Sequence, residues 1–163
     1  MWLPTGWDPE IHCPRGVDKT IDTVFIGTAT PRKKLFLDAI EPRIFGNGWA
    51  KGIPAIYLDD YCKMLSAAKI SINIHRDEIG VNRRLFESIG CTFTLTDNVP
   101  GVEEVLGKDL ARQVAFDTPE QGRTMVMHYL SHQAEREKLW QAERLAIMPY
   151  TYDEAVKKVL SYA

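Results

Sequence analysis

Residues 82–97, NRRLFESIGCTFTLTD, indicate the fold class of this chain. Leu85, Phe86 and Ile89 form an apolar face at helical spacing, and Gly90 is expected to end that helix. Residues 92–96 then alternate and are rich in β-branched side chains, which is typical of a strand. A short helix that leads directly into a strand is the repeating unit of an α/β protein.

The same alternation of strand and helix continues on both sides of this stretch. We expect strands at residues 23–26, 43–45, 70–74, 92–96 and 113–116, and helices at residues 32–40, 57–68, 82–90, 102–106, 118–131, 134–146 and 152–161. This order predicts an α/β fold with a parallel sheet and helices on both faces. Residues 1–20 are rich in Pro, Gly and Trp and are expected to form an extended arm, followed by one domain at residues 21–163.

The composition is that of an ordinary globular domain. The chain has 163 residues, 45% of them hydrophobic and 26% charged, with a net charge of −2. It lacks the basic excess of a nucleic-acid-binding protein, an apolar run of membrane-spanning length, and the layout of a secretion signal. Its cysteines, Cys13, Cys62 and Cys91, show no metal-binding or disulfide spacing. We therefore expect a cytoplasmic protein in which Cys62 and Cys91 are small core residues.

A binding site is expected where the strands end. Ligands of parallel sheets bind outside the carboxyl ends of the strands, which places residues 27–32, 75–84 and 97–104 together. The turn Gly27–Thr28 leads into a helix whose N-terminus suits a phosphate, and Arg32 and Lys33 add positive charge there. The alternative is a solvated, basic first turn.

Two further residues are candidates for ligand contact. His75 follows a strand and can donate to a sugar or phosphate oxygen, or it belongs to an exposed polar loop. Glu87 lies beside Phe86 in the apolar part of its helix, where an unpaired charge would be costly. Ribose hydroxyls would satisfy this carboxylate, but the spacing favours a salt bridge with Arg83 or Arg84.

Metal chemistry is not expected. His128 and His132 have a possible metal-ligand spacing of four residues. No third ligand is set beside them in a catalytic pattern, and no Asp-x-Asp motif occurs, so a plain surface helix is favoured.

The Asn-x-Arg-x-Phe-Glu pattern at residues 82–87 resembles the nucleotide-sugar-binding half of GT-B glycosyltransferases, most closely the CgeB-like (spore-maturation type) group. The resemblance extends to residues 2–4, 8–12, 22–28, 45–49, 67–74, 100–106, 129–136 and 150–152. It implies a single Rossmann-like GT-B half-domain, with residues 1–20 similar to the segment that links the two halves.

This resemblance implies a glycosyltransferase of the hexosyltransferase type that binds a nucleoside diphosphate sugar without a metal or other cofactor. Arg84 would face the pyrophosphate, Glu87 the ribose, and the turn at residues 100–102 would bring backbone amides to the donor. The expected donor-binding residues are Gly27, Thr28, Arg32, Lys33, His75, Asn82, Arg84, Glu87, Gly101 and Val102.

The resemblance is incomplete. Tyr150 and Ala155 stand where relatives usually have a histidine and an arginine. The acceptor half, where the catalytic base is commonly found, is not recognisable. A partner chain or a second copy would then complete the site, and Trp2, Trp7 and Trp49 would mark that surface, unless the Trp-rich arm folds back on its own domain.

Two other interpretations stay open. The domain can be a non-catalytic nucleotide- or protein-binding module that kept the fold. A flavodoxin-like or receiver-type domain is more distant, because Asp59 and Asp60 do not follow the first strand, where a receiver carries its acidic pair.

Overall fold

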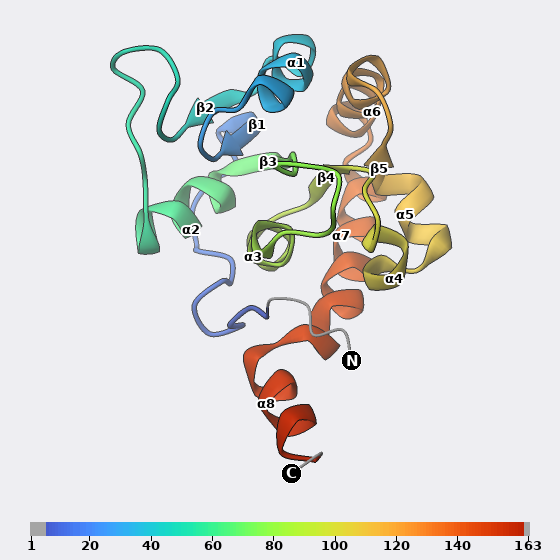
Figure 1. Cartoon of the computed structure of the whole chain (residues 1–163). Helices are drawn as coiled ribbons and strands as arrows, with labels where there is room; N and C mark the ends of the chain where they lie inside the picture. The colour runs from blue at the N-terminus through green and yellow to red at the C-terminus, as the bar shows by residue number, and fades with distance from the viewer. Residues whose placement is uncertain (1–5, 162–163) are drawn as a thin grey trace.

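The computed structural model describes residues 6–161, so the predictions for Trp2 and its neighbours lie outside the described residues. One parallel sheet of five strands has the order β2-β1-β3-β4-β5 (Figure 1). Its strands are β1 (Ile21–Ile26), β2 (Arg43–Phe45), β3 (Ala68–Asn73), β4 (Thr94–Asp97) and β5 (Ala115–Phe116). The strand order reverses between β1 and β3, and this is the position at which such sheets bind ligands.

Helices cover both faces of the sheet, as the sequence predicts. On one face lie α1 (Pro31–Ile40) and α6 (Pro119–Ser131), and on the other α2 (Leu58–Ala67), α3 (Arg83–Cys91) and α7 (Gln133–Ile147) (Figure 1). The remaining helices are α4 (Val102–Leu106), α5 (Lys108–Val114), the 3-10 turn η1 (Met148–Tyr150) and α8 (Tyr152–Leu160). The predicted Rossmann-like α/β fold is confirmed.

The core forms where the apolar faces of the helices meet the sheet. Leu85, Phe86 and Ile89 of α3 are fully buried, as their spacing predicts. On the opposite face Phe36 of α1 meets Phe116, with ring centroids 5.9 Å apart. Burial of each such side chain contributes about 1.5–3 kcal/mol, which is why these short helices are stable in this context.

The cysteines fit this core only in part. Cys62 and Cys91 are buried, which confirms the prediction that they are small core residues, and Cys13 is half-buried. All three thiols are free. The cytoplasmic location stays a prediction.

Several predicted boundaries are wrong. Gly90 does not end α3, which continues to Cys91. The strand expected at residues 92–96 begins at Thr94. Residues 113 and 114 complete α5, so β5 contains only two residues. Helix α5 is short, and only Gly107, at a φ of 79°, lies between it and α4. The sequence pattern alone does not show where α5 ends and the following strand begins.

The N-terminal arm packs against the C-terminal elements. Trp7 is only 2% exposed, and its indole Nε1 donates to the carbonyl of Ile147 at 3.0 Å. The backbone of Trp7 is bonded to Tyr150 and to Tyr152. The prediction that Trp7 marks an exposed surface is therefore wrong, and the folded-back alternative is confirmed for this residue.

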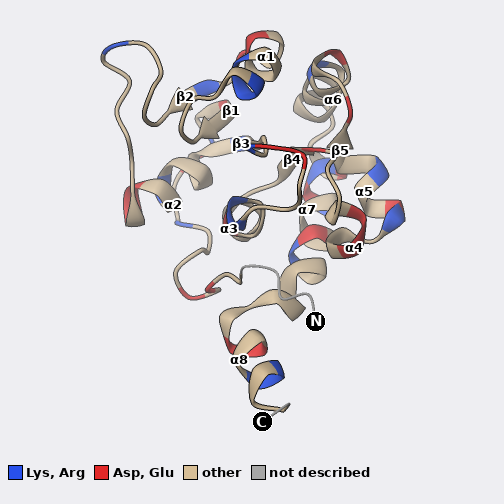
Figure 2. Ribbon diagram, in the orientation of Figure 1, with Lys and Arg blue, Asp and Glu red and all other residues tan. Residues whose placement is uncertain are grey.

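Charged residues of both signs are distributed over the ribbon, with basic residues at the start of α1 and α3 (Figure 2). These two helix starts face the carboxyl ends of β1 and β3. Within residues 6–161, no helix has the length and hydrophobicity that crossing a membrane requires.

Candidate functional site

The turn after β1 is shaped by close backbone contacts. Gly46 has a φ of 133°, and a Cβ there would lie 2.2 Å from the carbonyl oxygen of Gly27, so only glycine fits. Trp49 Nε1 donates to the same Gly27 oxygen at 2.7 Å. Thr30 caps α1 by accepting a hydrogen bond from the Lys33 amide at 3.3 Å. The loop after β2 thus packs against one side of the turn at Gly27–Thr28, which the sequence predicts to bind phosphate.

Two cations, Lys33 and Arg84, converge on the end of β1. Lys33 Nζ donates to the Thr28 carbonyl at 3.3 Å, and the Arg84 guanidinium donates to the Ile26 carbonyl. Burial lowers the pKa of Lys33, and the charge of Arg84 lowers it further. Among residues 6–161, neither side chain forms an ion pair with a carboxylate. Since the N-terminus of α1 adds partial positive charge, an anion would be stabilised here.

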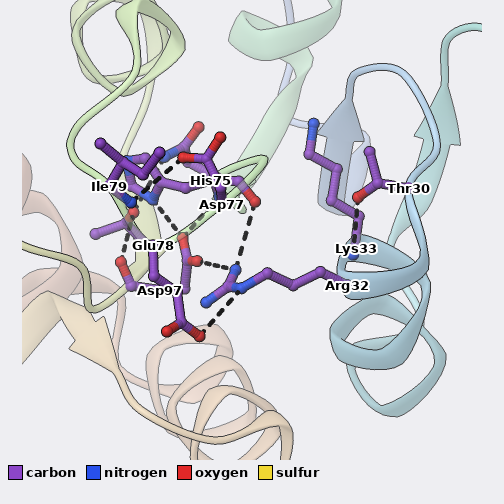
Figure 3. A network of polar contacts seen from close by, with 10 residues as sticks. Thr30, Arg32, Lys33, His75, Asp77, Glu78, Ile79 and Asp97 are labelled. Atoms are coloured by element: carbon purple, nitrogen blue, oxygen red, sulfur yellow. Dashed lines mark hydrogen bonds and ion pairs between the residues drawn. The ribbon is translucent and has the colours of Figure 1, made fainter.

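Arg32 and His75 belong to a neighbouring network around Asp97 (Figure 3). Asp97 Oδ1 accepts hydrogen bonds from His75 Nδ1 at 2.6 Å and from the His75 amide at 2.9 Å. The Arg32 guanidinium pairs with Asp97, and its Nε lies 3.7 Å from Glu78 Oε1. Lys33 extends away from this network, so adjacent residues of α1 serve two different clusters.

The network keeps Asp97 ionised although its side chain is only 1% exposed. Burial by itself would raise the pKa of Asp97. The hydrogen bonds and charge of His75, together with the hydrogen bond from Arg32, outweigh burial and hold that pKa below its ordinary value. His75 is itself buried, so the exposed-loop alternative for this residue is wrong.

Glu87 lies in a cavity of about 380 Å³ on the other side of Arg84. Its Oε1 is 2.8 Å from Arg83 Nε and 3.6 Å from His12 Nε2, which confirms the favoured salt bridge with Arg83. The other residues that line this cavity come from the arm, the start of α2 and α8: Asp8, Ile11, Ile56, Tyr57, Leu58, Tyr61 and Tyr152.

Three predicted donor-binding residues have clear structural roles. Asn82 caps α3, because its Oδ1 accepts from the Leu85 amide at 3.0 Å. Gly101 has a φ of 96° and precedes α4, whose first residue, Val102, is fully buried. Gly101 lines a separate hollow over residues 98–104, so the structure does not bring it to the cavity of Glu87.

The structure also adds residues that sequence reasoning missed. Asp97 was recognised only as the beginning of a loop, although a carboxylate at the end of a central strand is a signal that could have identified it. His12 and Tyr61 reach the cavity from elements distant in sequence, and no local pattern indicated their position.

Comparison with known proteins identifies a family for most of the chain. Residues 31–161 match the family model described as glycosyl transferase-like. No curated protein matches the sequence.

Solved structures of glycosyltransferases share the fold at low sequence identity. The sucrose-phosphate synthase from Thermosynechococcus elongatus is 12% identical with a TM-score of 0.70, over 98% of this chain and 51% of that one. The DNA-modifying enzyme β-glucosyltransferase, solved in the presence and absence of its substrate uridine diphosphoglucose, is 14% identical with a TM-score of 0.64, over 93% and 55%. A glycosyltransferase of avilamycin A biosynthesis is 16% identical with a TM-score of 0.53, over 99% and 58%.

The chain therefore spans about half the length of each of these proteins. Its sheet order and helix layers are those of one half-domain of the GT-B architecture. The family model covers most of the chain, and the fold agrees with it: the chain belongs to the glycosyl transferase-like family.

Proposed function

We propose that this chain is the donor-binding domain of a glycosyltransferase and binds a nucleoside diphosphate sugar. One observation carries the proposal: Lys33 and Arg84 converge at the end of β1 and the start of α1, and no carboxylate among residues 6–161 pairs with them. A diphosphate would supply the missing negative charge. Arg84 also lines the cavity of Glu87, which connects this anion site to a space large enough for a nucleoside.

The remaining cavity residues suggest how the nucleoside would lie. Both ion pairs of Glu87 involve Oε1, so Oε2 can accept from ribose hydroxyls. Tyr57 and Tyr61 offer aromatic surface for a base at the same cavity. The domain would hold the donor and stabilise the departing pyrophosphate with Lys33, Arg84 and the amides of the first turn of α1.

The finer assignments belong to this proposal as well. We place the chain in the CgeB-like group because of the pattern at residues 82–87. The acceptor would be bound by a second half, on a partner chain or a second copy. If the domain binds nucleotides but never supports transfer, the non-catalytic alternative is correct.

The test compares two neighbouring lysines of α1. Lys33 is buried at the proposed anion site and Lys34 is exposed, so Lys33→Met and Lys34→Met change the same charge in different places. Calorimetry with the diphosphates and the free nucleosides of uridine, guanosine and thymidine measures separately how much the phosphates and how much the nucleoside contribute to the binding free energy. Loss of a hydrogen bond to a charged group predicts about tenfold or greater weakening of diphosphate binding by Lys33→Met.

Lys34→Met should bind as the wild type does, and both variants should keep the wild-type circular dichroism spectrum. The proposal fails if the wild type binds no nucleoside diphosphate. It also fails if Lys33→Met weakens the diphosphates and the nucleosides equally, because the lysine then has no special role toward phosphate.

A further inference from the structure

Three possible metal ligands meet where α6 passes into α7. His128 lies in the last turns of α6, His132 joins the two helices, and Glu135 lies in the first turn of α7. Their ligand atoms all lie within 4.8 Å of one another, and all three residues are exposed. The two imidazole rings are stacked with centroids 4.1 Å apart, and His128 Nε2 is 2.8 Å from Glu135 Oε2.

A hydrogen bond determines which nitrogen of the His132 ring is free to bind a metal. Its Nδ1 lies 2.7 Å from the carbonyl oxygen of His128. A carbonyl oxygen only accepts, so Nδ1 carries the proton and Nε2 of the neutral ring keeps its lone pair. Metal-binding histidines commonly donate their other ring N–H to a carbonyl in this way.

We propose that His128, His132 and Glu135 bind a divalent transition-metal ion, with zinc as the first choice. Two imidazoles and one carboxylate are a set of ligands that zinc accepts, with a water in the fourth position. Metal–ligand bonds of about 2.0–2.2 Å at tetrahedral angles require about 3.4 Å between ligand atoms. The 2.8 Å contact between His128 and Glu135 must open slightly and the wider separations close, which exposed side chains can do by rotation.

The site is remote from the proposed donor cleft. Helix α6 begins just after the carboxyl end of β5 and packs against β3, β4 and β5. Gln133, the first residue of α7, lines a hollow with Lys69 and Thr92, which lie at the amino ends of β3 and β4. The last turn of α6 therefore lies at the opposite edge from Lys33 and Arg84. A metal bound there would join the end of α6 to the start of α7 and stabilise the fold without touching the donor, so this inference is independent of the proposed function.

The test measures zinc binding by calorimetry and by the rise in melting temperature on adding zinc chloride. His132→Ala removes a ligand from an exposed position, and Glu135→Gln removes the anionic one. Glu137→Gln is the matched control, since Glu137 is exposed two residues further along α7 and is not one of the three ligands. All variants also carry Cys13→Ser, because a half-buried thiol can bind zinc by itself.

We expect one zinc ion per chain and a higher melting temperature for the Cys13→Ser protein and for the Glu137→Gln control. His132→Ala and Glu135→Gln should bind zinc more weakly by at least the ~10–100-fold typical of losing an outer-sphere partner, with uridine diphosphate binding unchanged. Cobalt should give the visible spectrum of a four-coordinate ion in the control and not in His132→Ala. The site is disproved if zinc does not bind, or if His132→Ala binds zinc as tightly as Glu137→Gln does.

Discussion

Glu87 has basic neighbours on one oxygen only. Arg83 and His12 both approach Oε1, and the side chain lines the cavity beside Arg84. The salt bridge with Arg83 explains how α3 tolerates a carboxylate next to Phe86, and it does not occupy the second oxygen. A structural role and a ribose-binding role are therefore compatible at this residue.

Glu87→Gln separates these two roles, because glutamine keeps the shape and one acceptor but not the charge. If Oε2 accepts from ribose hydroxyls, affinity for uridine, guanosine or thymidine diphosphate should fall by about tenfold or more, as for other hydrogen bonds to charged groups. Calorimetry measures this, with Glu137→Gln as the exposed control. Unchanged affinity in a folded Glu87→Gln protein would leave only the salt bridge.

Glu143 is a third buried carboxyl group among residues 6–161, beside Glu87 and Asp97, and its situation is the reverse of that of Asp97. Its Oε2 accepts from the Thr94 amide at 3.1 Å, while its Oε1 is buried without a hydrogen-bond partner. Burial raises the pKa of Glu143 well above its ordinary value, and the Thr94 hydrogen bond opposes only part of that shift. At pH values between the unfolded and the folded pKa, the folded protein therefore holds a proton on Glu143 that the unfolded chain releases.

This difference gives a stability change with a defined sign. Because the folded pKa is raised, the contribution of Glu143 is most favourable below about pH 4.3, the unfolded value, and declines as the pH rises toward the folded value. Gln cannot ionise, so Glu143→Gln should gain stability relative to the wild type, by up to about 1.4 kcal/mol per pH unit across that window. Urea unfolding at several pH values measures the difference, and a pH-independent difference would contradict the assignment.

At the scale of elements, Gly90 shows how the arm and α3 depend on each other. A Cβ on Gly90 would lie 2.3 Å from the carbonyl oxygen of His12 and 2.9 Å from a ring atom of Trp7. The glycine therefore allows the arm to lie directly on α3. The arm in turn covers the helix and carries His12 to the cavity of Glu87.

Gly90→Ala should separate the arm from α3 and lower the free energy of unfolding by about 1–3 kcal/mol, the range for overpacked sites. Urea unfolding gives the free energy. A red shift of the tryptophan emission of Gly90→Ala that is absent in a Gly90→Ala/Trp7→Phe protein reports the exposure of Trp7, one of four tryptophans in the chain. Gly16→Ala is the matched control, because no atom lies within 4 Å of a Cβ at that position. Equal stability of the two variants would show that the arm moves aside without cost.

The same residue shows what local sequence can and cannot predict. Apolar spacing predicted α3, because the face that this helix buries has a period that is visible in the sequence. The sequence predicts that Gly90 ends the helix. Its role in the structure is to admit Trp7 and His12, which lie more than 75 positions earlier in the chain, so no local pattern indicates it. The sheet topology predicts that the segments carrying Arg32, His75 and Asp97 lie together, and the structure brings these three side chains into contact. No local pattern indicates that they bond to one another.

At the scale of the molecule, the proposed donor-binding residues come from the first turns of two helices and from the cavity beside them. Lys33 and Arg84 lie in the first turns of α1 and α3, and Glu87 lies one turn further along α3. The chain spans 51–58% of the length of three glycosyltransferases with the same fold. Positioning of two substrates can account for about 7–11 kcal/mol of a reaction barrier. Under the proposed function, this domain would position the donor alone.

We therefore expect that these 163 residues bind a nucleotide sugar but do not transfer the sugar efficiently. Incubation with a mixture of nucleotide sugars, with and without candidate acceptors, should release nucleoside diphosphate only slowly by hydrolysis. Addition of a polypeptide that carries an acceptor-binding half should restore transfer, and Lys33→Met should abolish the restored activity if the donor is held as proposed. Efficient transfer by a chain shown by light scattering to be a monomer would contradict this view, because the acceptor would then have to be positioned by residues of this domain alone.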